Sequence, residues 1–122
     1  MIEAAVLLLL LFQLKHWYID FVDQSMDEVH SKGKYGEWLG IRHSLKQGLG
    51  TYIAVALVVG PEYWIFSLVI ALFDFVVHYH TDWAKMNWGN RDIQTPAFWA
   101  HMGLDQMVHQ VTYILLAYMV CA

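Results

Sequence analysis

Hydrophobic residues along this chain gather in four long runs that short polar segments separate. The runs cover residues 3–24, 40–60, 62–84 and 96–121. Each reaches the roughly 20 residues that a helix needs to cross the apolar core of a membrane. Pro61 and Pro96 suit first-turn helix positions, and Thr95 is placed to cap the last helix. The pattern predicts one all-α domain over residues 1–122, a four-helix transmembrane bundle whose middle helices form a tight hairpin.

Composition supports a membrane protein over a soluble domain. Hydrophobic residues make up 58% of the chain and charged residues 15%, whereas about 25% of a typical soluble domain is charged. The net charge of −4 predicts no nucleic-acid surface. Cys121 is the only cysteine, so neither an internal disulfide nor a thiolate zinc site is expected. The expected surroundings are a lipid bilayer.

The basic residues indicate how the chain would be oriented. All seven lie on the side that carries the polar loops 25–36 and 87–95: Lys15, Lys32, Lys34, Arg42, Lys46, Lys85 and Arg91. Because basic residues concentrate on the cytoplasmic side of membranes, that side is predicted to be cytoplasmic, with both termini outside. Tryptophans near this boundary (Trp17, Trp38, Trp83, Trp88 and Trp99) and Tyr63 with Trp64 near the other fit an aromatic belt.

Histidine and aspartate recur four positions apart near the ends of three of these runs. The pairs are His16 with Asp20, His78 with Asp82, and Asp105 with His109. Spacing of four places both side chains on one face of a helix. Ionisable groups are costly in contact with lipid, so these faces are expected to point into the bundle.

The depths of these residues agree between helices. With a helical rise of about 1.5 Å per residue, each helix places polar residues about 20–26 Å from the end opposite the polar loops. The predicted metal ligands in this layer are His16, Asp20, His43, His78, Asp82, Asp105 and His109, with Asp74 beside them. His80 points to the opposite side of its helix, His30 is expected to be solvated, and His101 is undecided.

Imidazole and carboxylate ligands together suit a divalent metal ion such as zinc, iron or manganese. Seven candidates exceed one tetrahedral zinc site, so either two ions share the layer or some residues orient the ligands of one ion. The Glu-x-x-His signature of di-iron bundles is absent from the sequence, which weakens an oxygen-activating di-iron interpretation. A proton or ion relay and a purely structural network are the alternatives.

The two halves of the chain show an internal sequence similarity at an offset of 62 residues. A shift of 62 residues places His16 and Asp20 on His78 and Asp82, and His43 and Gln47 on Asp105 and His109. This is typical of two helical hairpins related by a parallel repeat, with a site between the halves, although chance is a rival explanation.

The motifs also resemble known families. The segment from His16 to Asp20 with Phe21 and Gln24, then Arg42-His43-Ser44, then His78 to Asp82 with Lys85, then Asp105-Gln106 to His109, resembles domain of unknown function 3307. That family consists of small bacterial and phage integral membrane proteins. Arg42-His43-Ser44 alone is similar to part of the histidine motif of inner-membrane metal-dependent hydrolases. The resemblances imply a helical bundle in a bacterial inner membrane and a metal site, and no demonstrated reaction.

Three functions follow as hypotheses. The first is a metal-dependent hydrolase that takes an amphiphile such as a lipid phosphate from the cytoplasmic leaflet. Asp82 or Asp105 would act as general base, and Lys85, Arg42 and Lys46 would bind the anionic head group at the mouth. The second is a non-enzymatic subunit whose polar layer is structural and whose loops meet a protein partner or a second copy. The third is an ion or proton conductor.

Overall fold

The computed structural model describes residues 2–122, and within that range every regular element is helical. The long helices are α1 (Ile2–Trp17), α3 (Trp38–Val59), α4 (Trp64–Trp88) and α5 (Pro96–Cys121). The short ones are the π turn η1 (Tyr18–Val22), α2 (Met26–Ser31) and the 3-10 turn η2 (Pro61–Tyr63). The predicted all-α class is therefore confirmed, and each hydrophobic run contains one long helix.

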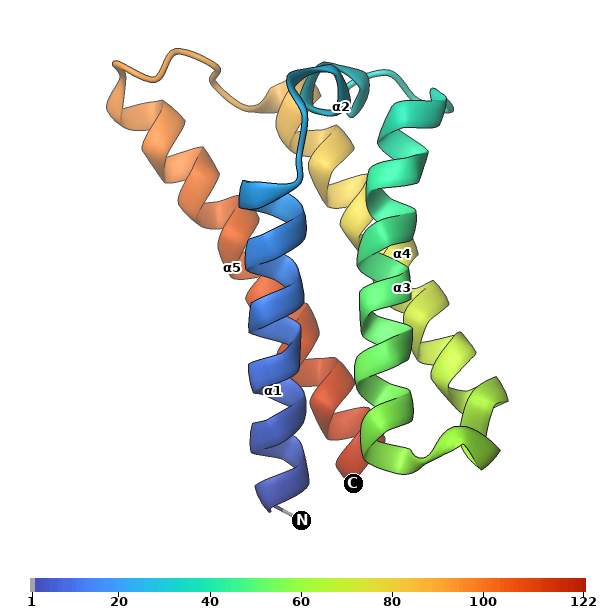
Figure 1. Ribbon diagram of the computed structural model, residues 1–122. Helices are drawn as coiled ribbons and strands as arrows, with labels where there is room; N and C mark the ends of the chain where they lie inside the picture. Colours follow the sequence, from blue (N-terminus) through green and yellow to red (C-terminus); the bar gives the residue numbers. More distant parts are fainter. Residues whose placement is uncertain (1) are drawn as a thin grey trace.

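The four long helices form a ring. α1 packs against α3 and α5, and α4 packs against the same two helices. α1 and α4 run in one direction and α3 and α5 in the other (Figure 1). Both chain ends and residues 60–63 lie at one end of the ring, called here the terminal end; residues 23–37 and 89–95 lie at the other, the loop end (Figure 1). The two polar loops thus share one end, as the sequence predicted.

The segment after α1 differs from the prediction. The first helix was predicted to reach about residue 24, and the chain is helical to Val22. Its last turn widens at η1, where the Asp23 N–H donates to the Tyr18 carbonyl at 2.8 Å. The polar loop predicted over 25–36 contains a short helix. Ser25 and Glu28 form a capping box: Ser25 Oγ accepts from the Glu28 N–H at 3.1 Å, and the Ser25 N–H donates to Glu28 Oε1 at 3.3 Å. This box starts α2.

The predicted tight hairpin between α3 and α4 is present. Gly60 alone separates α3 from η2, and its φ of 99° is a conformation that residues with a Cβ rarely adopt. Pro61 opens the 3-10 turn before α4 begins. At the start of α5, Thr95 Oγ1 accepts a hydrogen bond from the Phe98 N–H at 3.3 Å, which is the predicted cap.

The bundle is apolar outside and polar inside. Among residues 2–122, buried polar and charged side chains outnumber buried hydrophobic ones, while all four long helices expose large hydrophobic side chains. By length and composition, two segments of the described chain, Ile2–Val22 and Pro61–Trp88, are able to span a membrane. Such a distribution reverses that of a water-soluble domain.

The apolar part of the interior lies towards the terminal end. It consists of Leu8, Phe12, Ala54, Val55, Ile70, Tyr113, Leu116 and Ala117. Phe12 and Tyr113 pack with ring centroids 5.4 Å apart, and both are fully buried. This apolar core closes the bundle below the polar layer.

Replacing Phe12 with alanine is expected to lower the free energy of unfolding by about 3–5 kcal/mol, because a large buried ring is lost and a cavity remains. Leu10→Ala is the matched control, since Leu10 is 54% exposed on the same helix. Reversible unfolding in mixed micelles measures both variants. Equal losses in the two would contradict the placement of the core.

Candidate metal centre

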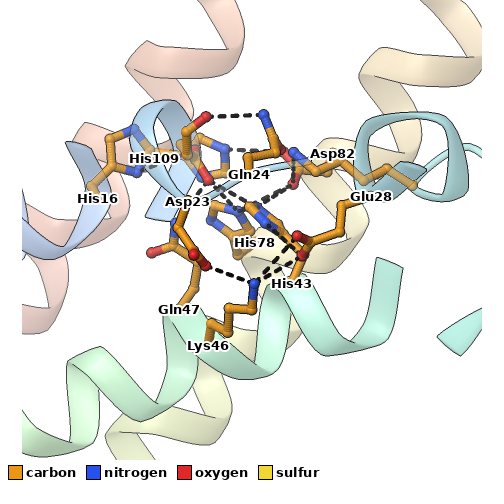
Figure 2. Close-up of polar contacts among 12 residues, drawn as sticks. His16, Asp23, Gln24, Glu28, His43, Lys46, Gln47, His78, Asp82 and His109 are labelled. Atoms are coloured by element: carbon orange, nitrogen blue, oxygen red, sulfur yellow. Dashed lines mark hydrogen bonds and ion pairs between the residues drawn. The ribbon is translucent and has the colours of Figure 1, made fainter. Parts of the chain in front are cut away.

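The seven predicted ligands meet in one buried layer between the apolar core and the loop end. α1 and η1 supply His16 and Asp20, α3 supplies His43, α4 supplies His78 and Asp82, and α5 supplies Asp105 and His109. Figure 2 shows several of these side chains converging from different helices. Polar residues from all four long helices therefore share the layer, as the depth argument predicted.

Four atoms form the centre of this layer: Asp20 Oδ1, His43 Nε2, His78 Nε2 and Asp82 Oδ2. His43 Nε2 lies 2.8 Å from Asp20 Oδ1, 3.4 Å from His78 Nε2 and 3.7 Å from Asp82 Oδ2. His78 Nε2 lies 3.6 Å from Asp20 Oδ1 and 3.1 Å from Asp82 Oδ2. Four ligands about 2.0–2.1 Å from a tetrahedral zinc ion would lie about 3.3 Å apart. These five separations bracket that value, and His43, His78 and Asp82 are the three of these residues that form one mutually close group.

Asp82 extends the cluster towards α5. Its second oxygen, Oδ1, lies 3.4 Å from His109 Nε2, which in turn lies 3.3 Å from Asp105 Oδ1. Asp82, Asp105 and His109 form one group able to hold a metal ion, and His43, His78 and Asp82 form another. The Asp82 carboxylate is thus shared between the two groups.

His16 sits at the margin of the layer. It forms a third such group with Asp20 and His78. Both of its ring nitrogens also have close partners, Nδ1 at 2.8 Å from the Tyr113 hydroxyl and Nε2 at 2.7 Å from Gln106 Oε1. With both nitrogens engaged, His16 is better placed to orient Asp20, whose Oδ2 is 3.5 Å away, than to bind an ion itself.

Sequence reasoning missed two residues of the layer, Glu28 on α2 and Lys32 directly after it. Glu28 Oε2 lies 3.7 Å from His43 Nδ1, and Lys32 Nζ lies 3.1 Å from Asp82 Oδ2. The signal was available, since Ser25 and Glu28 have capping-box spacing and Lys32 follows Glu28 by four positions. Gly40 permits the approach of α2, because a Cβ there would lie 3.2 Å from the Ser31 carbonyl oxygen.

Glu28 is also the centre of a charged group beside the layer. Lys46 Nζ lies 2.7 Å from Asp23 Oδ2 and 3.2 Å from Glu28 Oε2, and an Arg42 nitrogen lies 3.6 Å from Glu28 Oε1. Burial alone would raise the pKa of Glu28, but hydrogen bonds from Ser25 and Lys46 outweigh it and lower the pKa. Arg42 and Lys46 therefore anchor Glu28, and their predicted role at the mouth of the site stays a prediction.

Asp74 lies deeper than the proposed ligands and has a different partner. It accepts hydrogen bonds from Lys15 Nζ at 2.9 Å and from Thr51 Oγ1 at 2.6 Å. Lys15 also donates to Gln47 Oε1 at 2.7 Å, and Gln47 donates to Asp20 Oδ1 at 2.8 Å. Lys15, which the sequence counted among the basic residues on the side of the polar loops, lies inside the bundle, where its ammonium neutralises a buried aspartate.

The remaining histidines stay outside the layer. His80 bonds with the Val76 carbonyl and the Tyr35 hydroxyl on the outer face of α4, as its spacing predicted. His101 Nδ1 accepts from the Asn90 N–H at 2.8 Å near the loop end. His30 is exposed on α2, as predicted.

The charges of the layer nearly balance without an ion. Lys32 pairs with Asp82, and Lys85 Nζ lies 3.1 Å from Asp105 Oδ2, while Asp20 contacts only neutral or titratable groups. With neutral histidines, one negative charge is left over. One divalent ion would change this to one positive charge and two ions to three. The charge balance therefore favours a single ion over a pair.

The internal similarity at an offset of 62 residues agrees with where the structure places these side chains. Its eight members, His16, Asp20, His43, Gln47, His78, Asp82, Asp105 and His109, are all buried. Equivalent helices run in the same direction, α1 with α4 and α3 with α5 (Figure 1). The two hairpins thus contribute corresponding positions to the layer.

Comparisons with protein-family models, curated proteins and solved structures find no match to this chain. The resemblance to domain of unknown function 3307 stays a prediction.

Removing Lys15 tests the buried pair beneath the layer. Lys15→Met is expected to cost about 3–5 kcal/mol of unfolding free energy, because Asp74 would be left buried without a counter-charge. Adding Asp74→Leu should restore most of that loss. Lys34→Met is the control, since Lys34 is 74% exposed. A loss no larger than the control, measured in micelles, would show that the pair is not required.

Proposed function

We propose that this chain is an integral membrane protein whose interior binds one divalent metal ion and hydrolyses an amphiphilic, phosphate-bearing substrate taken from the cytoplasmic leaflet. The observation that carries the proposal is the convergence of Asp20, His43, His78 and Asp82 inside a bundle with an apolar exterior. Ionisable groups in such a setting mark functional sites more often than packing contacts.

The exterior supports four spanning helices in place of two. α3 exposes Leu49, Ile53 and Leu57, and α5 exposes Val111, Ile114 and Leu115, so both would face lipid as α1 and α4 would. Exposed aromatic residues stand near both ends of the bundle: Trp17, Trp38, Trp88 and Trp99 at the loop end, and Tyr63 and Trp64 at the other. We place the loop end in the cytoplasm of a bacterial inner membrane, with both termini outside.

The metal site is supported by buried donor atoms that form no hydrogen bond. Asp105 Oδ1 and His109 Nε2 make none within residues 2–122, although they lie 3.3 Å apart. Asp82 Oδ2 makes none either, and its contacts are the Lys32 and His78 nitrogens at 3.1 Å. Buried polar atoms without partners are rare and costly, and a coordinated cation or its water would satisfy them. Zinc, iron and manganese all accept such a set of imidazole and carboxylate ligands.

The residues divide into roles by position. Asp20, His43, His78 and Asp82 would hold the ion, with Glu28 orienting His43 and His109 close by. A bound divalent ion would lower the pKa of a coordinated water molecule and polarise a phosphoryl oxygen. Asp105 lies outside the four-atom centre and would serve as general base, and Lys85 beside it would bind the anionic group.

The structure supports the structural hypothesis better than the conductor hypothesis. A structural role is favoured by the lysine–aspartate pairs, which neutralise most of the buried charge without a metal. In that structural role, one protonated histidine, in place of a metal ion, would neutralise the remaining negative charge of the layer. A conductor is disfavoured, because the apolar core lies between the polar layer and the terminal end and leaves no polar route there within the described residues.

Elemental analysis of the purified protein is expected to find about one divalent ion per chain. His78→Ala should remove most of it, because two of the three candidate groups lose a ligand. His80→Ala is the control on the same helix, since His80 lies outside the layer. Protein without metal, with a stability that chelator does not change, would favour the structural alternative.

Hydrolysis is tested separately from metal binding. Metal-loaded protein is expected to release phosphate from a phosphomonoester lipid, and Asp105→Asn should lower turnover by about a hundredfold or more while retaining the metal. Release of phosphate should be followed over a panel of lipid phosphates. Metal-loaded protein that turns over none of them would reject the hydrolase and leave the metal site standing.

A further inference from the structure

Two cavities adjoin the polar layer near the loop end. The first, of about 700 Å³, opens between α4 and α5. The second, of about 530 Å³, lies beneath α2 and the segment that joins α4 to α5. Lys85 and His101 line both, so the cavities lie on either side of these two side chains. Volumes of this size are typical of sites for small organic ligands.

The lining of the first cavity changes from apolar to polar along its length. Val76, Val77, Leu104 and Val108 line it towards the middle of the helices, and Lys85, His101 and Asp105 line it nearer the loop end. Val76 is 50% exposed and Leu104 is 54% exposed, so the groove opens to the outside of the bundle. In a membrane this opening would face the acyl chains of lipids and not water.

The second cavity has a largely apolar lining whose charged side chains include more cations than carboxylates. Lys32, Lys85 and Arg91 line it, against Asp20. Arg91 donates only to the Met86 carbonyl, and within residues 2–122 it forms no ion pair. A guanidinium free of carboxylates is available for bidentate binding of a phosphate group. Asp20 belongs to the metal centre, so this cavity reaches the proposed reaction site.

We infer that the groove between α4 and α5 is a lateral binding site for a membrane lipid with an anionic phosphate head group. Its acyl chain lies along Val76, Leu104 and Val108, and its head group passes Lys85 to meet Arg91 beside the metal centre. This inference rests on the proposed function for the fate of the lipid. The shape and charge of the two cavities carry it independently of any reaction.

The arrangement explains why two cavities meet at Lys85. An amphiphile needs an apolar path from the bilayer and a charged end point. The first cavity supplies the path, and the cationic side chains of the second supply the end point. The Lys85–Asp105 pair crosses from α4 to α5 at the point where they meet. A phosphate group at this point would attract the ammonium of Lys85 and release Asp105.

The test uses the full chain with its bound metal in phosphatidylcholine nanodiscs. The probe is a phosphonate analogue of phosphatidate that carries a photoreactive group on its acyl chain and has no phosphate ester bond to cleave. Labelling is expected to concentrate on α4 and α5 around Val76 and Leu104. Unlabelled phosphatidate should compete, whereas phosphatidylcholine and inorganic phosphate should not.

Matched variants separate the two ends of the site. Leu104→Trp should fill the groove and abolish specific labelling, while Ile114→Trp, on an exposed part of α5 outside the groove, should not. Arg91→Gln should reduce the preference for phosphatidate over phosphatidylcholine about tenfold. Lys34→Gln should not change it, because Lys34 lines neither cavity.

Three results would overturn the inference. Equal competition by phosphatidylcholine would mean that the groove holds ordinary boundary lipid, competition by inorganic phosphate would mean an aqueous anion site, and even labelling of all four helices would mean no site. The metal content of each variant is measured in parallel. Bound metal with no lipid preference would reject this inference and leave the metal centre, whereas lipid binding without metal would reject the proposed function alone.

Discussion

Each ionisable side chain inside this bundle needs a partner, because neither lipid nor an apolar core can solvate a charge. Lys15 therefore pairs with Asp74, Lys32 with Asp82 and Lys85 with Asp105, and each pair joins two different elements. These pairs fix how the helices are set against one another. The Asp20 carboxylate has no lysine and lies instead against His43 and His78. The site forms where the pairing is incomplete.

The two ends of the interior differ in what they can do. Towards the termini, Phe12, Val55, Ile70 and Leu116 form a sealed apolar core. Towards the loops, α2 reaches down into the ring with Glu28 and Lys32, and cavities lie beside it. A bundle closed at one end and accessible at the other is suited to a reaction at a membrane surface and poorly suited to conduction.

Much of this arrangement could be predicted from the sequence, and the reasons are local. Helical spacing of four placed His78 with Asp82 and Asp105 with His109, and the equal depth of these pairs brought them into one layer. What could not be predicted depends on contacts between distant segments. Lys15 is indistinguishable by position from a boundary lysine until Asp74 is seen opposite it. Lys32 enters the layer only because α2 folds back against Gly40.

The central claim is that Asp20, His43, His78 and Asp82 bind one divalent ion. X-ray absorption spectroscopy of the metal-loaded protein tests it most directly, because it counts and identifies the atoms around the ion. The account predicts about four oxygen and nitrogen ligands, about 2.0–2.1 Å away if the ion is zinc, with the outer-shell scattering of two imidazoles and no sulfur. A spectrum without imidazole scattering, typical of an ion held by water and surface carboxylates, would contradict the claim.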